Sequence, residues 1–122
     1  MNKTEIEVGQ VFYASWGYDQ TNIDFVKVIG LTATKKTAIC RMVGKKRVDQ
    51  WTVAPTEPFG LVFRLQVRQG RDELYLVGSY PFVQGRGILN NADANGYGYD
   101  TRLGSFWLYT KPVYETPVGM GH

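Results

Sequence analysis

The sequence has little of what most catalytic chemistry uses. It holds one cysteine, Cys40, and one histidine, His122, in 122 residues. A single cysteine forms no intramolecular disulfide, and this usage is typical of a reducing compartment. A histidine at the last position has nothing to hold it in place, so we expect no catalytic triad, cysteine–histidine dyad or zinc site. We interpret Cys40 as a small buried hydrophobic residue of a strand.

Long apolar runs are absent as well. No stretch approaches the ~20 residues of a membrane helix, and the opening MNKTEIEVGQ lacks the apolar segment of a secretory signal. We therefore expect a cytoplasmic protein with no membrane partner. The net charge is only +3, with a pI near 9.0. Such a mildly basic chain permits an anionic partner without requiring one.

Helical periodicity is the third absence. Apolar residues rarely recur three and four positions apart, whereas β-branched and aromatic residues alternate with polar ones. The pattern predicts a single all-β domain over residues 1–122, with about seven strands in one curved antiparallel sheet or a small barrel. The expected strands are Val11–Tyr18, Asp24–Leu31, Thr37–Val43, Arg47–Val53, Leu61–Arg68, Leu74–Tyr80 and Ser105–Thr110.

The segments between these strands have the composition of turns and loops. Thr34–Lys36 and Gly44–Lys46 resemble hairpin turns. Ala54–Pro58 is predicted to be a rigid corner, since each proline fixes φ and removes a donor. Gly85–Gly104 is predicted to be one long loop rich in glycine and asparagine. A loop of this length in a compact domain tends to be functional or disordered.

The first expected strand carries aromatic residues on both faces. Phe12, Ala14, Trp16 and Tyr18 share one face, and Tyr13 lies on the other. This arrangement predicts a central strand that is covered on both sides. We assign Phe12 and Trp16 to the core.

Two loops are predicted to form a partner-binding surface, because binding residues concentrate on loops held by a rigid scaffold. One is the Asp-Gln-Thr-Asn turn that follows the first strand. The other is the long loop, whose two tyrosines are flat anchors of the kind that dominate interfaces. The alternative for the long loop is an idle disordered insertion. The predicted partner-binding residues are Tyr18, Asp19, Gln20, Asn22, Arg86, Tyr97, Tyr99 and Arg102.

Basic residues suggest a second surface. The simplest interpretation of Lys45–Arg47 is a solvated hairpin tip. If the strands that carry the basic residues are neighbours, a basic face with nearby aromatics can hold single-stranded nucleic acid or a small nucleotide. The residues of this possible nucleic-acid or nucleotide site are Lys45, Lys46, Arg47, Arg64 and Arg68.

Paired carboxylates are the remaining route to catalysis. Asp19 and Asp24 flank the polar turn, and Asp93 and Asp100 lie in the long loop. No calcium-loop spacing is present, and Asp and Asn in turns usually bond their own backbone. We therefore expect no metal site, no cofactor and no enzymatic turnover.

The run VGQVFYASWGYDQTNIDFVKVIGLTATKKTA resembles the opening of a family of small uncharacterised proteins carried by bacteriophages and plasmids. The similar features are the Val8-Gly9 pair, the aromatic strand, the Gly-Tyr-Asp-Gln-Thr-Asn turn at Gly17–Asn22, the Val-rich strand and the Thr-rich hairpin. The ending LYTKPVYETPVGMGH is also similar. The resemblance covers the first third and the last fifteen residues. It implies a mobile-element origin and carries no activity or catalytic residues.

Three functional hypotheses follow. The favoured one is a non-enzymatic phage-type accessory protein in the host cytoplasm, which binds and inhibits or redirects a host protein complex such as a defence system. This hypothesis rests on the context in which the resembling proteins occur. The alternative is a binder of single-stranded nucleic acid or a small nucleotide. An enzyme that uses the loop carboxylates is the least favoured.

Overall fold

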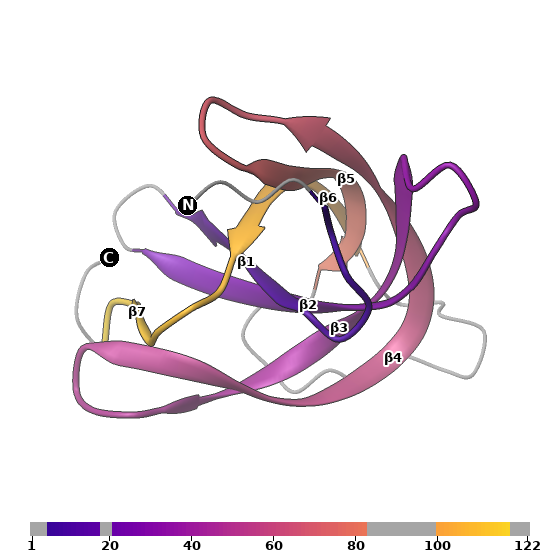
Figure 1. Cartoon of the computed structure of the whole chain (residues 1–122). Helices are drawn as coiled ribbons and strands as arrows, with labels where there is room; N and C mark the ends of the chain where they lie inside the picture. The colour runs from indigo at the N-terminus through magenta and orange to yellow at the C-terminus, as the bar shows by residue number, and fades with distance from the viewer. Residues whose placement is uncertain (1–4, 18–20, 83–99, 118–122) are drawn as a thin grey trace.

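The computed structural model describes residues 5–17, 21–82 and 100–117 (Figure 1). The strands are β1 (Val11–Trp16), β2 (Asn22–Leu31), β3 (Thr37–Arg47), β4 (Thr52–Gln69), β5 (Leu74–Phe82), β6 (Asp100–Leu108) and β7 (Val113–Tyr114). The described part of the chain contains no helix, and so none that could span a membrane. The prediction of an all-β fold is confirmed.

The strands form a closed barrel. Their order is β3-β2-β1-β6-β5-β4-β7, and neighbouring strands are antiparallel. An additional antiparallel pairing of β3 with β4 closes the sheet. β7 pairs with the beginning of β4 at Thr52 and Val53. Figure 1 shows β4 as one long band that curves around the barrel. Of the two predicted forms, the small barrel is therefore the one that occurs, and its closure leaves few free strand edges.

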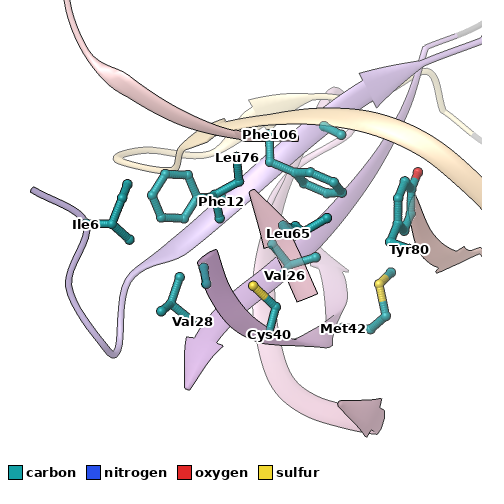
Figure 2. Packing of buried hydrophobic residues seen from close by; sticks show 12 residues of the cluster. Ile6, Phe12, Val26, Val28, Cys40, Met42, Leu65, Leu76, Tyr80 and Phe106 are labelled. Carbon is teal, nitrogen blue, oxygen red and sulfur yellow. The ribbon is translucent and has the colours of Figure 1, made fainter. Parts of the chain in front are cut away.

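The alternating pattern of the strands fills the barrel interior. Phe12, Val26, Cys40, Leu65 and Phe106 are at most 1% exposed, and their neighbours along each strand point outward. Figure 2 shows this core, with Ile6 at one side and Met42 and Tyr80 at the other. The assignments of Phe12 and Cys40 to the interior are confirmed, and Trp16 is half-buried.

A second, smaller core lies outside the barrel wall. Ile23, Phe25, Val43 and Val53 are buried there, and Tyr13 packs against them. The Phe25 and Tyr109 rings meet edge to face at 5.5 Å. β1 lies between β2 and β6 and contributes to both cores. The predicted central, doubly covered first strand is therefore confirmed.

The hairpin between β3 and β4 is not where the sequence pattern predicts it. Gly44–Lys46 belong to β3, and the predicted strand Arg47–Val53 is a turn over residues 48–51. The Asp49 carboxylate stabilises this turn, because it accepts hydrogen bonds from the backbone N–H groups of Trp51 and Thr52 at 2.8 and 2.9 Å. Gly44 marks a close approach instead of a turn, since a Cβ there would lie 2.6 Å from Thr56 Oγ1.

The predicted proline corner is also wrong. Residues 54–58 continue β4, with Pro55 opposite Lys45 and Pro58 opposite Val43. The register shifts between Val43 and Lys45, and a proline is tolerated at such a bulge because the ladder is already interrupted. β6 begins at Asp100, five residues before the predicted start and inside the predicted 85–104 loop. The part of that loop before residue 100 lies outside the described residues.

Candidate functional site

Side chains from four strands meet at one end of the barrel. β1 ends and β2 begins at this end of the barrel. β5 also ends there and β6 begins there, because both pairs run antiparallel. Asp24 lies opposite Ala14, and Tyr80 lies opposite Arg102. We call Trp16, Asp24, Tyr80 and Arg102 the polar end of the barrel. The Tyr80 ring joins it to the core through an edge-to-face contact with Phe106 at 4.9 Å.

Asp24 is the centre of the polar end. Its Oδ2 accepts hydrogen bonds from Trp16 Nε1 and from the Tyr80 hydroxyl, both at 2.7 Å. The Arg102 guanidinium lies 4.3 Å from the centroid of the Trp16 ring, a cation–π contact. Asn22 Nδ2 donates to the Trp16 carbonyl at 3.4 Å. These contacts lock four strand ends to one another.

Burial raises the pKa of three side chains. Desolvation raises the pKa of Asp24, against the opposing effects of the Tyr80 hydrogen bond, the Lys45 charge and the Trp16 hydrogen bond. Desolvation also raises the pKa of the Tyr80 hydroxyl, and the Asp24 charge adds to that effect. Burial raises the pKa of the Cys40 thiol to about 12. Tyr80 and Cys40 therefore stay protonated near neutral pH and are not activated nucleophiles.

The structure places two of the eight predicted partner-binding residues. Asn22 and Arg102 both lie at the polar end, Asn22 at the start of β2 and Arg102 in β6, where the sequence pattern predicts a loop. Tyr18, Asp19, Gln20, Arg86, Tyr97 and Tyr99 lie outside the described residues, as does Asp93. Of the other two carboxylates considered, Asp24 belongs to the polar end, while Asp100 begins β6. Within the described segments no group of three or more metal-ligating side chains comes together.

Sequence reasoning missed the part played by Tyr80 and Asp24. The signal for Asp24 was available, because it is the one acid among the inward positions of an expected strand that continues with Val26 and Val28. The signal for Tyr80 was not, because only the strand pairing brings its hydroxyl to a carboxylate 56 residues away.

The predicted basic residues are divided between two places. Lys45 and Arg47 bind Glu115, a residue only 7% exposed that also accepts the Ile23 N–H at 2.8 Å. Arg47 further donates to the backbone carbonyls of Glu115 and Thr116 at 2.8 and 2.7 Å. These bonds fasten the strap, residues 113–116, over the second core. The remaining predicted residues, Lys46, Arg64 and Arg68, are exposed.

Comparisons of the chain with protein-family models, with curated proteins and with solved structures give no match. The fold and the site thus define a class only, a small closed antiparallel barrel with an interlocked polar end. The resemblance to phage and plasmid proteins stays a prediction.

The raised pKa of Asp24 predicts a pH-dependent stability. The folded protein holds the Asp24 proton more tightly than the unfolded chain does. The contribution of this proton to stability is therefore complete below pH 3.8, and it is lost as the pH rises through the raised pKa. Asp24→Asn keeps an acceptor without the charge. We expect its melting temperature, relative to the natural sequence, to rise as the pH increases above 3.8 and to level off once the pH exceeds the raised pKa.

Asp49 is the matched control with the opposite sign. Its pKa is lowered, chiefly by the Trp51 N–H, so its contribution is lost as pH falls. Asp49→Asn should therefore melt below the natural sequence at neutral pH, and the gap should close in acid. A melting difference for Asp24→Asn that stays constant with pH would contradict the assignment.

Proposed function

We propose that the protein is a non-enzymatic binding protein whose partner docks on the polar end of the barrel. The observation that supports this most is the lock around Asp24, in which Trp16 and Tyr80 donate to one carboxylate oxygen. A surface held in this way binds with little loss of side-chain freedom, which favours affinity. The strand ends at Trp16, Asn22, Phe82 and Asp100 lead into the predicted binding loops from this same end.

The side chains at this end have the composition of a protein interface. Tryptophan and arginine are among the residues that carry most of the binding energy in interfaces, and Trp16 and Arg102 supply one of each. Tyr80, which is 1% exposed, supports them from inside the barrel through Asp24. Leu103, beside Arg102, is 74% exposed and adds an apolar contact on the rim. A protein partner suits this mixture better than a small charged ligand does.

The state of the reactive groups supports the non-enzymatic part of the proposal. The Tyr80 proton is bonded to Asp24, and the Cys40 thiol is buried with a raised pKa. Neither group is activated as a nucleophile. In line with the resemblance, we propose a phage-type accessory protein whose partner is a host protein complex, which it inhibits or redirects in the host cytoplasm.

The test replaces Arg102 and compares it with another arginine. Arg102→Ala removes the cation above the Trp16 ring and should lower recovery of the partner on a tagged copy at least about tenfold, the loss typical of an interface anchor. Arg64→Ala, on the exposed face of β4, should bind the partner as the natural sequence does. Quantitative mass spectrometry of the proteins recovered from the host measures both.

Both variants must melt within a few degrees of the natural sequence for the comparison to count. Equal recovery of the same partner by Arg102→Ala and Arg64→Ala would show that the partner binds elsewhere. Turnover of a substrate that Asp24→Asn abolishes would overturn the non-enzymatic assignment.

A further inference from the structure

An aromatic row crosses the outer wall of the barrel, away from the polar end. Tyr13 of β1 lies opposite Trp107 of β6, the Trp107 and Tyr75 rings stack at 4.5 Å and 23°, and Tyr75 of β5 lies opposite Arg68 of β4. We call Tyr13, Trp107, Tyr75 and Arg68 the aromatic row. Their neighbours Phe12, Phe106 and Leu76 are buried inside the barrel, so these four side chains point outward.

The row is partly open to solvent and closely supported. Trp107 is 37% exposed and Arg68 is exposed, whereas Tyr75 is half-buried and Tyr13 packs against the second core. The turn between β4 and β5 packs against the rings, since a Cβ at Gly70 would lie 3.3 Å from Tyr75 Cδ1 and 3.6 Å from Trp107 Cζ3. Trp107 is the second-last residue of β6 and Tyr75 the second of β5. The row therefore lies toward the end of the barrel where β5 begins and β6 ends, opposite the polar end.

Positive charge flanks the row on both sides. On one side are Arg68 and Arg64 of β4, with Lys36 beside them, whose carbonyl accepts the Val67 N–H at 2.9 Å. On the other side is Lys27 of β2, opposite Val11. The outward positions of β1, β2, β5, β6 and residues 64–68 of β4 whose side chains are described carry no acid. The nearest acids in sequence are Asp72 and Glu73, in the turn.

We propose that the aromatic row binds single-stranded nucleic acid. Bases stack on aromatic side chains whatever their sequence, and cations beside the rings hold the phosphates. In a duplex the bases are stacked on one another, so only the phosphates would remain for this surface. The row should therefore prefer a single strand to a duplex. Since it lies away from the polar end, this activity is separate from the proposed protein partner.

The experiment measures the affinity of fluorescent oligothymidylate and oligouridylate of about 12 nucleotides, within the usual site size of a small barrel. Both are titrated by anisotropy near 50 mM salt, where phosphate contacts are strong. Trp107→Ala should weaken binding about tenfold. Trp51→Ala should not, although Trp51 is also exposed and stacks on Tyr114 at 6.3 Å.

A second variant keeps the test valid if Trp107→Ala does not fold. Arg68→Ala should make the fall of log affinity with log salt shallower by about 0.7, the value of one phosphate contact on a single strand. A preference for the deoxy or the ribo strand supports the proposal and identifies the sugar. Equal affinity for a duplex, equal loss in Trp51→Ala, or no binding of either strand overturns it. If neither strand binds, the row is either a cross-strand stack that stabilises the sheet or a surface that binds a protein.

Discussion

Replacing Glu115 with alanine should lower the free energy of unfolding by about 3 kcal/mol, because it leaves buried groups without their partner. The carboxylate is the acceptor for the Ile23 N–H and for the side chains of Lys45 and Arg47. Both cations are about one-third exposed, at 38% and 33%, so water relieves part of the loss and the low end of the usual range applies. Denaturant unfolding measures the change.

The chain offers an exposed ion pair as the control. Glu5 binds Lys35 at 3.2 Å, and both side chains are about 60% exposed. Glu5→Ala should cost under about 0.5 kcal/mol, as surface pairs usually do. If the two variants lose the same free energy, Glu115 is no more than a surface charge. If Glu115→Ala is severely destabilised, the short strap depends on this residue, since β7 itself pairs with only two residues of β4.

Replacing Gly104 with alanine should cost about 2 kcal/mol and should also damage the polar end. A Cβ at this position would lie 2.8 Å from Tyr80 Cε1 and 3.4 Å from Phe106 Cε1, so the Tyr80 ring must move. Movement of that ring stretches the 2.7 Å bond from its hydroxyl to Asp24. Partner binding at the polar end should therefore weaken together with stability.

Gly30 supplies the comparison for this substitution. A Cβ there would meet Ile39 at 3.5 Å, an ordinary van der Waals distance. Gly30→Ala should stay within about 0.5 kcal/mol of the natural sequence, as most harmless surface changes do. A Gly104→Ala protein as stable as Gly30→Ala would mean that the Tyr80 ring adapts freely, and the proposed rigidity of the polar end would fail with it.

The substitutions at Glu115 and Gly104 test two connected parts of the structure. Glu115 holds the strap that covers the second core, and the same Lys45 that binds it contributes its charge to Asp24. Gly104 lies opposite Gly78 and leaves space for the ring that carries the hydroxyl to Asp24. Stability of the outer strap and order at the polar end are thus linked through a few side chains.

Much of the fold could be predicted because strand patterns are local. The alternation that places Phe12, Val26 and Cys40 on inward positions repeats every two residues, whatever the strand pairs with. The β3–β4 hairpin was misplaced because its glycine and lysines have the composition of a turn. The actual turn depends on Asp49 and its three short-range bonds. The corner predicted at the prolines was wrong for the same reason. The effect of a proline on a strand depends on whether the partner strand has a bulge beside it.

The sequence by itself determined the fold class, the interior positions of the strands and the buried position of Cys40, because periodicity and residue type decide these locally. Only the tertiary structure decided which distant side chains meet. Lys45 reaches Glu115 across 70 residues, Tyr80 reaches Asp24 across 56, and the aromatic row exists only through the register of four strands. A shift of one residue in any pairing would turn those side chains to the other face. The register of a closed barrel is set by all its strands together, so no single segment contains it.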